Sequence, residues 1–272
     1  MSDPTKTTLY TGSTLISVDR QTTGQFVIKS GTTRIAKNAF DGCEKISAVV
    51  IPASVREFEQ GAFAHCTGIR EVFFDGSVEE WLRCEFDTYT AHPCHARGAT
   101  IFFDGRILDE IDVPDTVKTI KQFAFVACTN IKKVNIPRSV QVIGTHAFLD
   151  CVNLEEVRSE EGLKGIGFHA FNHCTSLKHI NLPDGIERIR NNAFIDCPSL
   201  RHLFLPRSLV EVGAGIGMAC DNLEFYCENG PGLYWNKYWN KTNPKARTAT
   251  AKTYCNIPRW WYEQNIAASS GI

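Results

Sequence analysis

Cysteine and histidine are the residue types in this chain that could bind a metal ion or act as nucleophiles. The 272 residues include 11 cysteines and 8 histidines. Four of them, Cys84, His92, Cys94 and His95, lie within 12 positions of one another. Thiolate and imidazole groups are the usual ligands of zinc, but no C-x₂-C or H-x₃-H spacing accompanies them. The alternatives are a zinc site and a solvent-exposed loop, and the spacing favours the loop, in which Cys84 and Cys94 would be the first thiols to react.

Two adjacent pairs, His65-Cys66 and His173-Cys174, also combine an imidazole with a thiol. Nucleophilic catalysis needs contact between the two side chains and a lowered thiol pKa, whereas neighbouring residues in a strand or turn point apart. The sequence has no glycine-rich phosphate loop, no H-E-x-x-H and no G-x-S-x-G. We therefore predict no catalytic residues, no bound metal and no cofactor, and a protein that is not an enzyme.

Most of the cysteines instead follow a fixed interval of 23 residues. Ala-Phe pairs keep the same interval, three positions before the cysteines. We predict that both sets are buried structural residues and that the cysteines pack as small hydrophobic thiols. The cysteines are Cys43, Cys66, Cys128, Cys151, Cys174, Cys197 and Cys220, and the phenylalanines are Phe40, Phe63, Phe125, Phe148, Phe171 and Phe194.

The elements that position these residues follow one repeat, I-P-x-S-V-x-x-I-G-x-x-A-F-x-x-C-x-x-L-x-x-V-x. Alternating apolar residues in its L-x-x-V-x-I part predict a short strand with one face inward, which proline ends. One repeat cannot bury that face alone, so neighbouring repeats must stack, with parallel strands about 4.8 Å apart. The array predicts a β-rich solenoid. Complete repeats begin at Ile28, Ile51, Val113, Ile136, Ser159, Leu182 and Leu205.

The repeat register divides the chain into an N-terminal cap at 1–27, a solenoid at 28–227 and an aromatic C-terminal cap at 228–272. An insertion of 39 residues at 74–112 interrupts the solenoid. Ser77 and Glu80 form a capping-box pattern at its start, which predicts a helix whose Trp81 packs back on the array. Residues 101–105 predict a returning strand. Cys227 and Cys255 flank the last segment and either pair or remain thiols.

The repeat resembles the BspA-like, or treponeme-type, leucine-rich repeats of gut and oral bacteria and some protozoa. Seven in-phase copies and parts of both flanks carry the resemblance. It implies a right-handed leucine-rich-repeat array and a binding or adhesion scaffold for a protein or a glycan. It also implies a bacterial protein that is secreted or lies on the cell surface. The first eight residues are polar and form no apolar signal segment, which favours the cytoplasm instead.

The amino-acid composition limits the classes of partner that this chain is expected to bind. Lys and Arg number 29 and Asp and Glu 30, which gives a formal net charge of −1 and argues against a dedicated nucleic-acid binder. No apolar run approaches the ~20 residues of a membrane span, so we predict no membrane insertion. A protein partner is the first expectation and a glycan the second, with the oligomeric state open. The alternative functions are a metal-dependent or enzymatic module centred on 74–112, and an intracellular assembly partner.

The candidate binding residues are the outward positions beside the valine of L-x-x-V-x-I. They vary in chemistry while the inward positions stay uniform. Charged members are typical of any solvated face, whereas exposed aromatics are enriched at interfaces, unless each covers the edge of a neighbour. The candidates on this face, which is expected to be concave, are Glu156, Arg158, His179, Asn181, His202, Phe204, Phe73 and Lys133.

Overall fold

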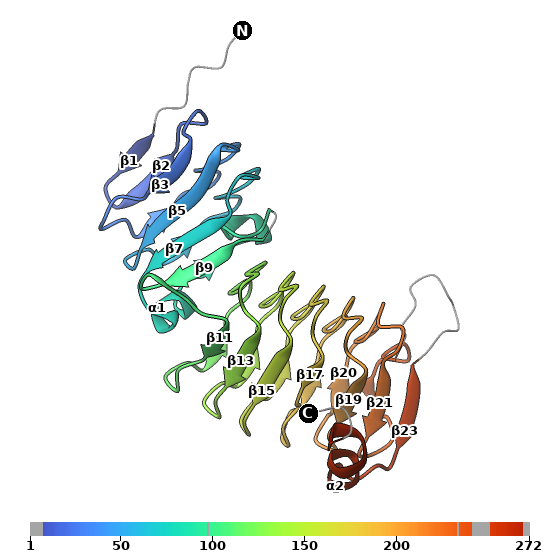
Figure 1. Ribbon diagram of the computed structural model, residues 1–272. Helices are drawn as coiled ribbons and strands as arrows, with labels where there is room; N and C mark the ends of the chain where they lie inside the picture. Colours follow the sequence, from blue (N-terminus) through green and yellow to red (C-terminus); the bar gives the residue numbers. More distant parts are fainter. Residues whose placement is uncertain (1–7, 97, 233, 241–250, 269–272) are drawn as a thin grey trace. The chain divides into compact units, whose positions relative to one another are not determined.

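A computed structural model describes residues 8–96, 98–232, 234–240 and 251–268. The described chain is a stack of coils with strands on two walls, and nearly all neighbouring strands are parallel (Figure 1). The predicted solenoid of parallel strands is therefore confirmed. The coils fall into two compact units, which we call unit 1 (Met1–Asp109 with Lys121–Asn130) and unit 2 (Glu110–Ile120 with Ile131–Ile272).

Unit 1 contains two five-stranded sheets. The first has the order β1 (Leu9–Thr11), β2 (Thr14–Ser17), β4 (Arg34–Ile35), β6 (Glu57–Phe58), β8 (Glu85–Phe86). The second has the order β10 (Arg106–Ile107), β9 (Thr100–Phe103), β7 (Glu71–Asp75), β5 (Ile46–Pro52), β3 (Gly24–Val27). Helix α1 (Val78–Leu82) and the 3₁₀ helix η1 (Tyr89–Ala91) lie between β7 and β9 in sequence. The pairs β1–β2 and β9–β10 are antiparallel.

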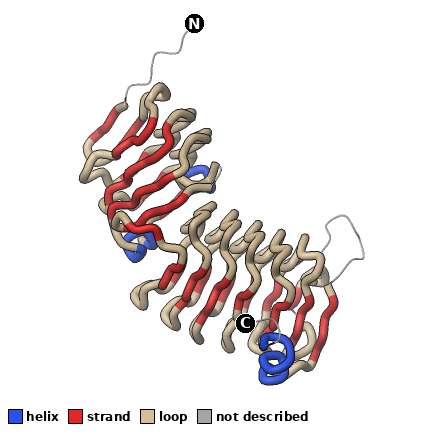
Figure 2. The backbone as a smooth tube through the Cα atoms, viewed as in Figure 1, coloured by secondary structure: helices blue, strands red, loops and turns tan. Residues whose placement is uncertain are grey.

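Unit 2 has three parallel sheets. One wall is the sheet β12 (Thr119–Ile120), β14 (Val142–Ile143), β16 (Gly165–Ile166), β18 (Arg188–Ile189), β20 (Glu211–Val212), β22 (Tyr234–Trp235). The other wall comprises β11 (Glu110–Asp112), β13 (Lys133–Ile136), β15 (Glu156–Ser159), β17 (His179–Ile180), and then β19 (His202–Leu205), β21 (Glu224–Cys227), β23 (Lys252–Cys255). Helix α2 (Arg259–Tyr262) continues into a π-helix, η2 (Glu263–Ala267). Figure 2 shows how short the strands are beside the loops that join them.

The core lies between the two walls of each unit. Every repeat phenylalanine and cysteine identified above is 0% exposed. The rings of Phe148, Phe171 and Phe194 stack nearly parallel, with centroids 5.2 and 5.5 Å apart. The thiol of Cys174 donates to the carbonyl of Phe148 at 3.1 Å, and Cys197 does the same to Phe171. Equivalent residues of neighbouring repeats therefore stack on one another. The cysteines are free thiols and form no disulfides.

Two positions in most coils adopt the left-handed backbone conformation, one before the Ala-Phe pair and one before the cysteine. In one coil they are His146 and Asp150, with φ of 54° and 61°, and in the next they are His169 and His173, with φ of 53° and 59°. Glycine, Asn, Asp and His tolerate this conformation better than other residues. This backbone preference accounts for the histidines that recur beside the cysteine, a cause that sequence analysis missed.

The insertion at 74–112 forms one longer coil and a hairpin. Glu71 pairs with Thr100, 29 residues on, and the antiparallel pair β9–β10 and its turns use the remaining ten residues before Glu110. The predicted capping box at Ser77 is confirmed, and so is the burial of Trp81, whose indole N–H donates to the carbonyl of Ala124 at 2.7 Å. The returning strand is β9.

The expectation that the Cys/His cluster of this insertion is an exposed loop is wrong. Cys84, His92, Cys94 and His95 are only 1, 0, 1 and 8% exposed. Strands β8 and β9 extend both walls of unit 1, so the residues between them face the interior. His92 lies against the ring of Phe86, with centroids 4.8 Å apart. Over the described ranges, no three His, Cys, Asp or Glu side chains gather as a metal site.

Both ends of the array carry atypical strands. The predicted N-terminal cap contains β1, β2 and β3, and β1 pairs with β2. At the other end β23 pairs with β21 and places Cys255 opposite Cys227, both as thiols. Residues 1–7, 241–250 and 269–272 of the predicted caps lie outside the described residues. Among the helices described, none has the length and apolar character needed to cross a bilayer.

Candidate binding surface

The open face of unit 2 is the outward surface of strands β11, β13, β15, β17, β19 and β21. Residues two apart on a strand share a face, so each strand contributes one side chain to each of two rows. The first row is Glu110, Lys133, Glu156, His179, His202 and Glu224, and the second is Asp112, Asn135, Arg158, Asn181, Phe204 and Tyr226. Seven of the eight residues predicted for binding therefore lie in these two rows, and the eighth, Phe73, belongs to unit 1.

Glu156 is the centre of a small charge cluster on the open face. Its carboxylate accepts from Arg158 Nε at 2.7 Å and lies 3.7 Å from the Lys133 ammonium. The Arg158 side chain remains 64% exposed. Exposed ion pairs stabilise a fold by only about 0–1 kcal/mol. The cluster therefore orients the guanidinium toward solvent, where a partner can reach it.

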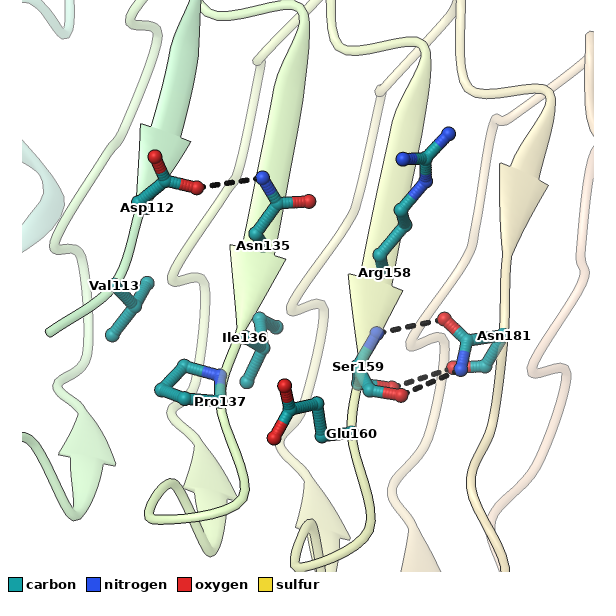
Figure 3. Close-up of a pocket in the computed structure, with 9 residues that line it drawn as sticks. All are labelled: Asp112, Val113, Asn135, Ile136, Pro137, Arg158, Ser159, Glu160 and Asn181. Atoms are coloured by element: carbon teal, nitrogen blue, oxygen red, sulfur yellow. Dashed lines mark hydrogen bonds between the residues drawn. The ribbon is translucent and has the colours of Figure 1, made fainter. Parts of the chain in front are cut away.

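A groove of about 530 Å³ crosses the ends of strands β11 to β17 (Figure 3). Its lining includes Asn135, Arg158 and Glu160. The Asn135 amide donates to the carboxylates of Glu110 and Asp112, each at 2.7 Å. Positively and negatively charged side chains thus line the groove together with a neutral amide. The groove therefore suits a ligand with complementary polar groups.

One repeat that lines the groove departs from the template. Ser159-Glu160 stands where the template has Ile-Pro. The side chain of Asn181 takes the place of a backbone hydrogen-bond partner for Ser159. Asn181 Nδ2 donates to Ser159 O at 2.6 Å, and Ser159 N donates to Asn181 Oδ1 at 2.7 Å (Figure 3). The Asn181 amide is thus engaged within the protein and shapes the groove.

His179 and His202 lie between two further hollows, one of about 400 Å³ beside Lys178 and Arg201 and one of about 280 Å³ beside helix α2. Burial lowers the pKa of both imidazoles below 6.5, so both rings are neutral at pH 7. Within the described chain, neither Nδ1 atom has a hydrogen-bond partner. Each ring therefore has one buried nitrogen that makes no hydrogen bond within the described chain.

Phe204 points outward from β19 as predicted but is only 5% exposed. The ring of Tyr262 lies 5.1 Å from it, and the Arg259 guanidinium lies 4.7 Å above its centre. Tyr226, the next aromatic in the row, is also buried under this helix. The expectation of an exposed Phe204 is therefore wrong. Sequence analysis missed these helix contacts, although the aromatic run at Trp260, Trp261 and Tyr262 was their signal.

Phe73 belongs to unit 1 and is part of a separate surface. Its side chain is partly exposed and its ring stacks on Phe102, with centroids 4.5 Å apart. Phe102 was not among the predicted residues, although the alternation at 100–103 places it at the corresponding outward position.

Comparisons with known proteins concern the repeat whose strands form this surface. A profile described as "BspA type Leucine rich repeat region" matches residues 20–91 and 98–224 in six copies. A search of curated proteins found no match.

Among solved structures, a leucine rich cell surface protein from Faecalibacterium prausnitzii is similar at 23% identity and a TM-score of 0.57, covering 78% of this chain and 60% of that one. The chain thus spans less than two thirds of that protein, and the likeness shows the fold. A T. pallidum leucine rich repeat protein matches at 24% identity and a TM-score of 0.46, over 74% of this chain and 90% of that one. A leucine-rich repeat protein from Bacteroides capillosus matches at 32% identity and a TM-score of 0.29, over 30% and 66%.

Proposed function

This chain belongs to the BspA-type leucine-rich repeat family, and we propose that it is a non-catalytic scaffold that binds a protein partner through the open face of unit 2. Stacked repeats present extended surfaces on which side chains can vary without disturbing the core. The observation that carries the proposal is the contrast between two kinds of position. The interior repeats Phe and Cys, whereas the outward first row runs Glu, Lys, Glu, His, His, Glu.

A protein fits this face better than a glycan. Sugar recognition commonly uses an accessible aromatic ring, and the two aromatic side chains of the second row, Phe204 and Tyr226, are buried. The face instead offers the Arg158 guanidinium, the Glu156 carboxylate and two neutral imidazoles. Mixed charge with polar groups suits a complementary protein surface.

The alternative of a metal-dependent or enzymatic module at 74–112 has less support. Its cysteines and histidines are packed inside unit 1, and burial lowers the pKa of His92 to about 3. The ring of His92 packs against Trp81 and Phe86, which suits a core position. For the setting, the Faecalibacterium protein is described as a cell surface protein, which supports display on a bacterial surface for this chain too.

Reversing one charge on each wall tests the proposal. A partner captured from candidate surface proteins is titrated against the wild-type chain, Arg158→Glu and the control Arg188→Glu, whose exposed arginine lies on β18 of the opposite wall. We expect about a tenfold or greater loss of affinity for Arg158→Glu and none for the control. Unchanged binding by Arg158→Glu would remove the open face of unit 2 from consideration. Loss in the control alone would move the site to the other wall.

A further inference from the structure

Five apolar side chains form a continuous row across the outward face of the second sheet of unit 1, β10-β9-β7-β5-β3. Strand register places them opposite one another in the order Val27, Val50, Phe73, Phe102 and Ile107. Val27 and Ile107, at the two ends, are 63% and 59% exposed. We call these five residues the apolar row. Isolated exposed apolar residues are ordinary, but a contiguous set marks a site of interaction.

Carboxylates flank the middle of the apolar row. On β7, Glu71 and Asp75 stand two positions either side of Phe73, so all three share the outward face, and both carboxylates are exposed. Asp104, in the turn after β9, is also exposed. Lys29, two residues after Val27, is a basic residue at one end of the apolar row. A partner that covers the row therefore meets negative charge beside its apolar contact.

Unit 2 shows how this fold covers such residues. Phe204 has the template position of Val27, Val50 and Phe73, because it lies four repeats of 23 residues after Phe73 once the 39-residue insertion is set aside. Helix α2 and its continuation η2 lie over Phe204 and Tyr226 with their apolar side chains inward. The cover also carries a basic group, because Arg259 lies over the Phe204 ring and pairs with Asp184 at 3.0 Å. The cover is thus a short amphipathic helix with a basic flank.

We propose that the apolar row binds an amphipathic helix of a partner protein, with lysine or arginine flanking its apolar face. The row crosses four strand spacings, about 19 Å, which is the length of about 13 helical residues. Apolar residues at helical spacing would contact Phe73 and Phe102, and the basic flanks would meet Glu71 and Asp75. The inference rests on the proposed scaffold function but uses a different surface.

The probes are three fluorescent helical peptides of about 14 residues, titrated against the full chain by anisotropy. Two share a leucine face and differ in lysine or glutamate flanks, and the third is a scrambled lysine peptide. We expect the lysine-flanked helix to bind about tenfold or more tightly than the other two. Phe73→Ser should abolish this binding, and the double variant Glu71→Lys/Asp75→Lys should reverse the preference. The control Phe168→Ser, at a 43% exposed phenylalanine of unit 2, should bind as the wild type does.

Equal affinity for the lysine and glutamate helices would overturn the proposal, and so would a double variant that keeps the lysine preference. The double variant changes exposed positions only, so it remains informative if Phe73→Ser folds poorly. Sedimentation that shows a dimer dissolved by Phe73→Ser would assign the row to a second copy of the chain and also overturn the helix. Arg158→Glu separates the two proposals, because it should leave peptide binding intact while it weakens the partner of unit 2.

Discussion

His92 is a buried imidazole that should make the stability of unit 1 depend on pH. Burial lowers its pKa to about 3, whereas an unfolded chain would protonate near 6.5. As pH falls below 6.5 the unfolded state therefore gains a proton that the folded state does not, and stability decreases until about pH 3. Between pH 7 and 5 we expect His92 to account for a loss of about 2 kcal/mol.

The His92→Gln variant tests this linkage, because glutamine keeps hydrogen-bonding groups but does not titrate. Free energies of unfolding by urea at pH 7 and pH 5 give the difference for each protein. We expect a smaller acid-induced loss in the variant, whatever its stability at pH 7. Equal losses in the variant and the wild type would show that His92 does not carry the effect.

His179 and His202 should make partner binding sensitive to acid. Burial lowers the pKa of both below 6.5, so neither changes charge between pH 7 and 8 and both become cationic only as pH falls below about 6.5. Affinity should therefore be flat from pH 8 to 7 and change in acid. Titration of the captured partner across this range, with His179→Gln/His202→Gln as the non-titrating control, checks the expectation. A change centred between pH 7 and 8 would contradict it.

Phe148 shows what one core position contributes. It is fully buried and its ring stacks on Phe171 at 5.2 Å. Truncation by Phe148→Ala should cost about 3–5 kcal/mol of unfolding free energy, because lost burial adds to a cavity. The exposed Phe168 provides the control, since Phe168→Ala should cost under about 1 kcal/mol. Equal denaturation midpoints for wild type and Phe148→Ala would mean that the repeat register is wrong.

At the scale of single residues, the sequence predicts what the repeat itself enforces. Phe148 and Cys174 recur at one interval, and a recurring apolar residue in a stack has to face its own copies. The burial of Phe204 and Cys94 was not predictable in this way. Each depends on a segment outside the template, α2 in one case and the long coil of the insertion in the other.

At the scale of secondary-structure elements, the position of a cysteine in the fold determines whether its thiol can react. Ten cysteines are buried and Cys255, on the terminal strand β23, is exposed. Burial raises the pKa of Cys84 to about 12, and burial together with the adjacent Cys255 does the same for Cys227. Thiolates are the reactive form, so we expect one fast thiol in the native protein and ten more on unfolding. Mass spectrometry after a short alkylation pulse should find the label on Cys255, and label on Cys84 or Cys94 would contradict the buried coil.

Helices and strands were predicted correctly where a few neighbouring residues carry the signal. The capping box at Ser77 and the strand at 100–103 are readable from a few residues. Strand β8 was not, because it has only two residues and its place is fixed by pairing with β6. Strand β1 was missed for a similar reason, since it exists as a hairpin partner of β2.

At the scale of the whole chain, the ends of the sheets must be covered. The antiparallel pair β1–β2 ends one sheet of unit 1, and without it β4 would present an open edge. Open edges pair with other chains, and a net charge of −1 gives little repulsion. Deletion of residues 8–17 should therefore produce concentration-dependent association. Light scattering after size exclusion, with the full chain as control, measures it, and a monodisperse monomer would refute the capping role.

The long coil between β7 and β9 exceeds the common repeat by six residues (29 − 23), yet strands on both walls stay in register. The excess is taken up around α1, away from the ladders. Insertion tolerance is therefore concentrated at one site of the coil. Over generations such an array can gain length there without losing its scaffold. A designer can use the segment around α1 to graft a foreign epitope.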